Sequence, residues 1–443
     1  MLQLAYFPNP VQIFHLAFLF ITEYYGWVAF LLGLAYMLWH LYLEEIQGQF
    51  VRGIDWVFLE ITPPKENLVS TLAVESIFAQ MHALHRSLTF AEKYVEGQFQ
   101  QWYSLEIVSF GGKVCFIIKA PRRYWHLVES AFYSQYPSAE IREIDDYMEN
   151  FKYDPQDPDN QNEIFGVEFK LTEDSVIPLK TYKDFEHTAA EETVVDPLSN
   201  LFETLQRLEP WEFIGLQLLV QVIQNDEIKG RVEKKVKELI GQEFPHKASF
   251  SEFFLKPVSA FSKLSYKEAL IGEKHSRMEE NKPRTNWLNM TEGEKERVTL
   301  IEKKFGKPNY NCKLRLLYIT PKEKYDKIRR FEVIGVYRHF SSGFYNTMKT
   351  DRQTWTKVDP LFSQKLEQPV LDWITNYRKR WFVKGYKARS IYIGSSKFLL
   401  STEEIASLYH FPITTKTSFV PSGVLAVATK KVQPPADLPI LEQ

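Results

Sequence analysis

Residues 24–43, YYGWVAFLLGLAYMLWHLYL, form a run of twenty residues without Asp, Glu, Lys or Arg. Because an α-helix rises 1.5 Å per residue, a helix of this length spans about 30 Å, the thickness of the hydrocarbon layer of a bilayer. Aromatic residues gather at both ends of the run, as they do at membrane interfaces. The run predicts a membrane-spanning helix, and a buried core helix is the alternative. A cleaved signal peptide is not expected, because a basic start and a small-residue cleavage site are missing.

The segment before this run is apolar but shorter. Residues 9–23, NPVQIFHLAFLFITE, end at Glu23, whose charge would be costly inside lipid, so an interfacial or re-entrant helix is expected there. Lys and Arg are missing from residues 1–23, whereas Arg52 and further basic residues follow the run. This asymmetry favours a single-pass protein of the cell membrane with most of the chain in the cytoplasm. Residues 1–50 are therefore the predicted anchor.

The hydrophobic pattern after the anchor predicts a first α/β unit over residues 51–150. Gly111 and Gly112 separate two apolar runs and are a strong signal for a two-residue hairpin. The order β-α-β-β-α-β predicts a ferredoxin-like unit, with two helices on one face of a four-stranded antiparallel sheet. Strands are expected at residues 54–62, 103–110, 113–119 and 139–144, and helices at residues 68–88 and 121–136.

A polar linker at residues 151–163 precedes a restart of the same pattern in residues 164–400. The second unit fits the ferredoxin-like order if a polar, helical insertion at about residues 225–309 opens its central hairpin. The predicted fold class is thus α+β, with residues 401–443 as a C-terminal docking tail. Strands are expected at residues 164–171, 211–223, 312–319 and 390–394, and helices at residues 196–208, 226–241, 291–306 and 321–340.

The composition excludes a strong overall field, because 54 basic residues nearly balance 56 acidic ones. Aromatic residues make up 15% of the chain, which favours filled cores over disorder. Cys115 and Cys312 both fall in predicted strands and are expected to be reduced, buried thiols in a protein that faces the cytoplasm.

Motifs for catalysis are missing from the sequence. There is no G-x-x-x-x-G-K-S/T phosphate loop, dinucleotide fingerprint or nucleophile elbow, so no enzyme activity and no cofactor are expected. His82 and His85 lie one helical turn apart, but no third metal ligand is evident. An acidic cluster resembles a cation site in composition alone and is more typical of a solvated strand edge. It comprises Glu140, Glu143, Asp145, Asp146 and Glu149.

One stretch is chemically distinctive. Between Asp372 and Glu403 there is no acidic residue, and basic residues alternate with aromatic ones such as Tyr377, Phe382 and Tyr386. This pattern suits phosphate and base contacts with nucleic acid, anionic lipid headgroups, or a basic connector with aromatics in a core. The candidate contact residues are Arg378, Lys379, Arg380, Trp381, Lys384, Lys387 and Arg389.

Several segments also carry a family resemblance. They are the anchor, WVFLEITPPKEN, AVESIFAQMHALH, WYSLEIVSFGGKVCFIIKAPRRYWHLVESAFYSQYPSAEI, STEEIASLYHFP and KKVQPPADLPI. Together they resemble a family of membrane proteins of small-genomed bacteria, similar to the non-motor N-terminal half of type IV secretion or conjugation-type membrane ATPases. In that family a P-loop motor of the DNA-translocase kind follows the LPI-like segment. Here the sequence ends at Gln443, so the motor is expected to be a separate chain, or this chain the shortened form of a two-part gene.

The resemblance implies a non-catalytic, membrane-anchored scaffold of a type IV secretion-like or conjugation-like system. Its expected partners are the membrane, a P-loop ATPase, DNA and further copies of itself, since ferredoxin-like sheets associate edge to edge in rings. The alternative is a membrane-bound nucleic-acid-binding protein that uses the basic strip at residues 378–389. A membrane-bound hydrolase using His82, His85 and the acidic cluster is a third, less favoured interpretation.

Overall fold

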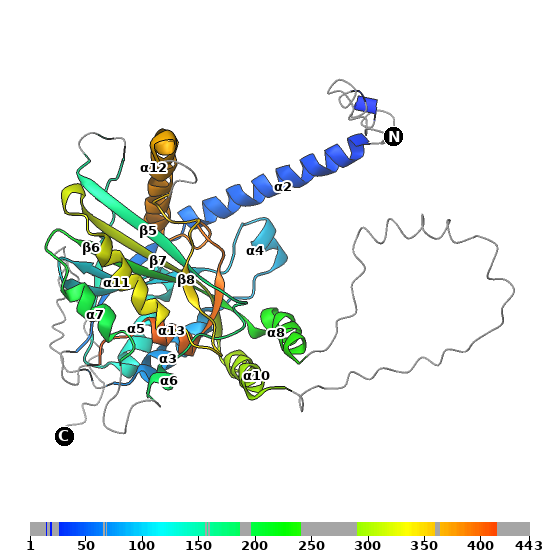
Figure 1. The fold of residues 1–443 in the computed structure, drawn as a ribbon. Helices are drawn as coiled ribbons and strands as arrows, with labels where there is room; N and C mark the ends of the chain where they lie inside the picture. Colours follow the sequence, from blue (N-terminus) through cyan, green and yellow to red (C-terminus); the bar gives the residue numbers. More distant parts are fainter. Residues whose placement is uncertain are drawn as a thin grey trace, which may run out of the picture. The chain divides into compact units, whose positions relative to one another are not determined.

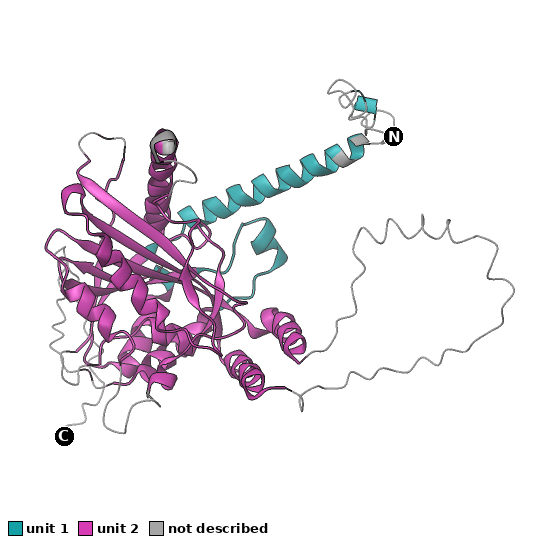
Figure 2. Ribbon diagram, viewed as in Figure 1, with its two compact units in different colours: residues 1–56, 85–101, 121–123 teal, residues 57–84, 102–120, 124–443 magenta. Residues whose placement is uncertain are grey.

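The computed structural model describes residues 15, 18–19, 26–64, 67, 69–155, 157, 160–186, 196–240, 290–358 and 364–413. The chain divides into two compact units (Figure 2). The first unit comprises residues 1–56, 85–101 and 121–123, and the second comprises residues 57–84, 102–120 and 124–443. Several predictions fall partly outside the described residues: the segment at residues 1–23, the start of the span at residues 24–43, the linker at residues 151–163, the middle of the insertion, and the end of the tail.

The first unit contains the helix α2 (Gly26–Arg52) and the short helix α4 (Phe90–Tyr94). Thr89 and Glu92 form a capping box at the start of α4, since each side chain accepts a hydrogen bond from the backbone of the other. The rings of Trp39 and Tyr94 lie 6.0 Å apart and pack α4 against α2. No helix in the described ranges is both long enough and apolar enough to cross a bilayer.

The second unit is built on an antiparallel sheet (Figure 1). Among the described residues, nine strands join in one sheet with the order β4-β1-β3-β2-β6-β7-β5-β8, and β9 pairs with one end of β7. The strands are β1 (Trp56–Thr62), β2 (Trp102–Phe110), β3 (Lys113–Pro121), β4 (Glu140–Ile144), β5 (Asn162–Leu171), β6 (Phe213–Ile223), β7 (Asn309–Pro321), β8 (Met348–Thr350) and β9 (Phe398–Ser401).

Alternation along these strands gives the sheet two buried faces. On β7, for example, Leu314, Leu316 and Tyr318 belong to one core cluster, whereas Leu317 and Ile319 belong to another. The larger cluster lies under most of the helices, and α12 (Gln364–Ala388) covers the smaller one. The helices over the larger cluster are α3 (Thr71–Met81), α5 (Trp125–Gln135), α6 (Tyr182–Glu186), α7 (Ser199–Gln206), α11 (Lys327–Arg338) and α13 (Thr402–Leu408). Short 3-10 turns lie at His82–Leu84, Arg122–Tyr124 and Lys322–Lys324.

Apart from β9, the described strands of the sheet form two similar groups of four. The order β4-β1-β3-β2 in the N-terminal group corresponds to β8-β5-β7-β6 in the C-terminal group, so the same order occurs twice. The two groups join where β2 pairs with β6, from Trp102 opposite Gln221 to Phe110 opposite Phe213. The predicted hairpin between β2 and β3 is confirmed. Gly111 and Gly112 have φ of 55° and 86°, the left-handed values that a two-residue turn of this type requires.

Two helices of the insertion between β6 and β7 are described. They are α8 (Asn225–Leu239) and α10 (Glu292–Phe305), close to the positions predicted from sequence, and they pack against each other. Val232 and Ile301 form a small apolar cluster with Val176 and Ile177. Residues 241–289 lie outside the described part of the chain.

Two predictions about the C-terminal part are wrong. Residues 390–394 are not a strand; the edge position beside β5 belongs to β8, which has only three residues and no apolar periodicity to reveal it. The start of the predicted docking tail is core, because α13 packs on α3 and Tyr409 and Phe411 lie in the larger core cluster. Phe411 contacts Phe116 of β3 with ring centroids 4.9 Å apart. Residues 414–443 lie outside the described range.

Both cysteines are buried free thiols, as expected. They belong to different core clusters, Cys115 beneath α12 and Cys312 in the larger cluster on the other face of the sheet. Burial raises the pKa of both thiols, which keeps them protonated and unreactive.

Candidate functional site

The predicted basic strip lies on the C-terminal half of α12, and much of its charge is used inside the chain. Lys379 Nζ lies 2.6 Å from Glu163 Oε1, and Lys379 is buried. Arg380 Nη2 lies 2.6 Å from Asp154 Oδ1, with both side chains partly exposed. The ion pair between Lys379 and Glu163 holds α12 against the start of β5, so it stabilises the fold.

Two further basic residues of the strip bind backbone carbonyl groups. Arg378 Nη1 donates to the Trp355 carbonyl at 3.2 Å. Lys387 Nζ donates to the carbonyl oxygens of Glu149 at 3.2 Å and Phe151 at 2.9 Å. These contacts attach α12 to the loops that follow β8 and β4.

The structure therefore does not bring the seven candidate residues onto one surface. Arg380, Trp381 and Lys384 are exposed, whereas Lys379 and Arg389 are buried. A nucleic acid needs several accessible cations along its backbone, and this strip presents few of them.

Arg389 directly follows the last residue of α12 and has a left-handed backbone conformation, and its side chain contacts β2 of the sheet. Its φ is 50°, which is uncommon for a residue with a branched or long side chain. Its side chain is fully buried, with Nε 3.1 Å from Glu106 Oε1 and Nη1 2.5 Å from Asp146 Oδ2. Burial alone would lower the pKa of Arg389, but the neighbouring negative charges of Glu106 and Asp146 raise it above its ordinary value.

Glu106 lies on β2, at the seam between the two strand groups, and it collects four donors. These are Arg389, Ser104 Oγ at 2.7 Å, Tyr147 Oη at 2.6 Å and Gln217 Nε2 at 3.0 Å. A buried carboxylate with this many partners is fully satisfied and fixes the positions of its neighbours.

The network continues across β6 to a second buried ion pair. Arg315 Nη1 donates to Gln217 Oε1 at 3.2 Å, and Arg315 Nε lies 2.7 Å from Glu168 Oε1. The backbone N–H of Ser395 also donates to Glu168. Arg315 further donates to the carbonyl of Gly385 on α12 at 3.0 Å. A continuous chain of hydrogen bonds and ion pairs thus runs from β2 through β6 and β7 to β5, beneath α12.

Two strand glycines allow α12 to lie this close. A Cβ atom at Gly166 of β5 would overlap the ring of Phe382, and one at Gly215 of β6 would overlap the hydroxyl of Tyr386. Tyr386 is fully buried, and its hydroxyl lies 3.0 Å from that of Tyr147. Glycine in these strands therefore makes room for the aromatic side chains of the helix.

Two buried lysines border the network. Burial lowers the pKa of Lys119 on β3 and of Lys313 on β7 to about 8. Lys313 Nζ donates to the Ile393 carbonyl at 2.8 Å. Burial thus brings the pKa of each lysine close to neutral pH.

The outer face of α12 carries an aromatic stripe that the strip prediction missed in part. We define the stripe as Val370, Trp373, Tyr377 and Trp381, whose exposed fractions are 59%, 66%, 60% and 37%. Residues spaced by three and four lie on one face of a helix, so these four side chains are neighbours. The predicted strip does not include Trp373, and its helical spacing to Tyr377 and Trp381 is the signal that indicates it.

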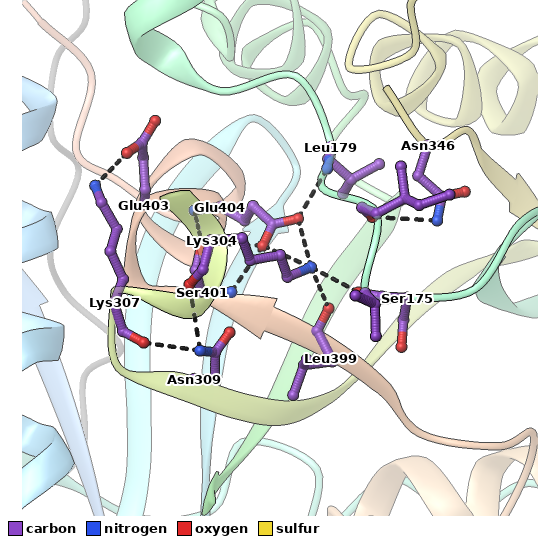
Figure 3. Close-up of polar contacts among 12 residues, drawn as sticks. Ser175, Leu179, Lys304, Lys307, Asn309, Asn346, Leu399, Ser401, Glu403 and Glu404 are labelled. Carbon is purple, nitrogen blue, oxygen red and sulfur yellow. Dashed lines mark hydrogen bonds and ion pairs between the residues drawn. The ribbon is translucent and has the colours of Figure 1, made fainter. Parts of the chain in front are cut away.

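A separate buried pair lies on the other face of the sheet. Figure 3 shows Lys304 of α10 reaching Glu404 of α13, with Lys304 Nζ 2.9 Å from Glu404 Oε2. Lys304 also donates to the carbonyl oxygens of Ser175 at 2.8 Å and Leu399 at 2.9 Å. Burial lowers the pKa of Lys304, and the Glu404 carboxylate opposes that effect. The pair fastens the insertion to the end of the core.

The histidine and carboxylate candidates are not assembled into a metal site. No group of three or more His, Cys, Asp or Glu side chains within the described ranges is placed to hold a metal ion. His82 Nε2 lies 3.0 Å from the Ile223 carbonyl oxygen. Of the acidic cluster, Glu140 pairs with Arg142 at 2.5 Å and Asp146 pairs with Arg389. These contacts are structural.

A surface pocket of about 450 Å³ lies beside α12. Its lining combines the cations Lys327, Lys357 and Lys379 with the acids Glu163 and Asp372. This mixture of signs does not select an anionic or a cationic ligand.

The fold and this site define an α+β protein whose antiparallel sheet is covered on both faces and is crossed by a buried ionic network. The chain belongs to a family described as "Domain of unknown function (DUF8128)", which matches residues 42–418. Among curated proteins, none matches the chain.

Proposed function

We propose that the chain is a non-catalytic scaffold, held at a membrane by the apolar segment that includes α2. It would serve a type IV secretion-like or conjugation-like machine and dock a separate P-loop ATPase. In this proposal each four-strand group is a ferredoxin-like unit, and the C-terminal group carries the insertion. The secretion and ATPase parts rest on the sequence resemblance.

The observation that carries the membrane part is the surface of α2. Large apolar side chains are exposed along the N-terminal part of α2, and an exposed apolar surface of this size supports contact with lipid or with another protein. The span expected from sequence begins at residue 24, outside the described residues. The exposed side chains are Trp27, Val28, Phe30, Leu31, Leu32, Leu34, Tyr36, Met37, Leu38, Trp39, Leu41 and Tyr42.

The ferredoxin-like assignment is supported by the repeated strand order and by the helices between the strands. In the first group α3 follows β1 and α5 follows β3; in the second group α7 follows β5 and α11 follows β7. The scaffold assignment is supported by the buried charges, such as Arg389 and Arg315, which are bound to groups of the chain itself.

The membrane part is tested by alkaline carbonate extraction of membranes from cells that make the full chain. We expect the protein to stay in the membrane fraction. A charge near the middle of α2, Leu34→Glu, is expected to release it, because an acidic side chain there costs about 2.5–3.5 kcal/mol in lipid. Gln49→Glu adds the same charge near the polar end of α2 and is the matched control. Full release of the unmodified chain would contradict the anchor.

The docking part is tested by purifying the full chain in mild detergent and identifying the proteins that accompany it. A P-loop ATPase is expected with the full chain and is expected to be lost from a chain that ends at Lys416. If nucleic acid accompanies the chain in place of an ATPase, the scaffold proposal is wrong and the nucleic-acid alternative replaces it.

A further inference from the structure

We propose that the aromatic stripe of α12 is a second, peripheral membrane contact that docks on a bilayer surface containing anionic lipids. The inference rests on the proposed attachment of the chain to a membrane, and it concerns a surface outside α2. It is carried by the composition of the stripe, its exposure and the charges beside it.

The helix α12 has two apolar faces, only one of which is covered. Phe382, Val383 and Tyr386 are buried against the sheet. On the other face, Trp373 and Tyr377 are among the most exposed large side chains of the second unit, and their rings stack with centroids 6.2 Å apart and planes at 18°. An exposed apolar surface of this kind on a helix is typical of a binding surface.

The residues that continue the stripe are cationic. Lys384 follows Trp381 on the same face and is exposed, and Arg380 lies at its side. Both side chains of the Arg380–Asp154 pair are solvent-accessible, so the pair contributes little to stability. The sequence has no acidic residue between Asp372 and Glu403. The C-terminal end of the stripe thus carries the exposed cations Arg380 and Lys384 beside the acid Asp154, and this excess of positive charge favours negative headgroups.

The side chains of the stripe match a membrane interface better than a nucleic acid. Trp and Tyr favour the headgroup level, where a ring has apolar contacts and its polar atom stays hydrated. Lys can extend its ammonium group to the phosphates while its stem contacts acyl chains. A nucleic acid would need more phosphate contacts than Arg380 and Lys384 supply.

The test places an environment-sensitive fluorophore at one end of the stripe in the full chain, through Val370→Cys. Both native cysteines are buried, so the label is directed to position 370. The probes are vesicles of phosphatidylcholine, with and without phosphatidylglycerol. We expect a blue shift of emission with vesicles, larger when phosphatidylglycerol is present. The label at an exposed position of α8, through Glu233→Cys, is expected not to shift.

A chain that also carries Trp373→Ser and Trp381→Ser is expected to lose the shift at position 370. Carbonate extraction of the same vesicles reports on α2 independently. If the chain resists extraction but the emission at position 370 does not shift, the inference about α12 is wrong and the anchor stands. If the chain is extracted but the shift is present, the anchor is wrong and the inference stands. A shift produced by a single-stranded oligonucleotide and not by vesicles overturns the lipid assignment in favour of nucleic acid.

Discussion

Lys304 and Glu404 form an ion pair from which water is almost completely excluded, with Nζ 2.9 Å from Oε2 and side-chain exposures of 3% and 0%. Glu404 is also the N3 residue of the capping box at the start of α13, where its carboxylate accepts a hydrogen bond from the Ser401 N–H at 2.7 Å. One carboxylate thus orders the end of the core and binds the insertion.

We expect Lys304→Met to destabilise the protein by about 3–5 kcal/mol, because the variant leaves the Glu404 carboxylate buried without its cation. The free energy of unfolding, measured by urea titration with circular dichroism, reports the loss. Lys303→Met changes an exposed lysine on the same helix and is the control. Equal stability of the two variants would show that Glu404 does not depend on Lys304.

Arg389 and Glu106 are expected to be energetically coupled. In a double-mutant cycle with Arg389→Met and Glu106→Gln, each single change leaves a buried charge without its partner, and the second change removes that charge. We expect a coupling energy of about 0.5–3 kcal/mol, with the double variant less destabilised than the sum of the single variants. Unfolding free energies measured by chemical denaturation give the value. Strict additivity would mean that Asp146 alone balances Arg389.

Lys313 is expected to make stability depend on pH above neutrality. Its pKa is about 8 in the folded protein because of burial, and its ordinary value is about 10.4. Below pH 8 the folded state bears the full cost of burying the ammonium group. As the pH rises from about 8 to about 10, the folded state loses the proton while the unfolded state keeps it, so that cost falls.

The measurement compares the unfolding free energies of the unmodified chain and Lys313→Met across this range. We expect the unmodified chain to gain on the variant by up to about 1.4 kcal/mol per pH unit. Using the difference removes the contribution of the tyrosines and cysteines, which titrate in both proteins. A difference that does not change with pH would contradict the buried, charged lysine; Lys349→Met, at an exposed lysine of β8, serves as the control.

Gly215→Ala is expected to destabilise the protein by about 1–3 kcal/mol, because the added methyl group would overlap the Tyr386 hydroxyl and push α12 from the sheet. Gly335→Ala on α11 is the matched control, since its Cβ would meet open space. In a helix interior that change is expected to stabilise by about 0.5–1 kcal/mol. Melting temperatures that move in opposite directions would support both assignments.

The helices and strands could be predicted from the sequence where neighbouring residues carry a signal for them. The hairpin at Gly111 and Gly112 and the charged helices α8 and α10 each carry a local signal. The strand β8 carries none, because three residues are too few for periodicity. The helix α13 has the capping box of Ser401 and Glu404 as a local signal, but its seven residues are held in the core by contacts with α3, which only the folded chain provides.

The buried network was the part of the site least visible in the sequence. Glu106, Glu168 and Arg315 each lie within a strand, at positions where apolar residues are expected. Charges at such positions indicate partners on neighbouring strands, but the identity of the partners depends on strand order. The basic residues of α12 gave the pattern of a binding surface because their internal partners lie far away in the sequence. Glu163, for example, precedes Lys379 by 216 residues.

The pairing of β2 with β6 has a mechanical consequence. Because β6 also pairs with β7 from Phe213 opposite Ile319 to Ile223 opposite Asn309, the two longest ladders share one strand. Tension along the strand direction would load all the hydrogen bonds of these ladders at once, whereas a peeling force would break them singly. The sheet is therefore stiff against traction along its strands, and its two strand groups would move as one plate.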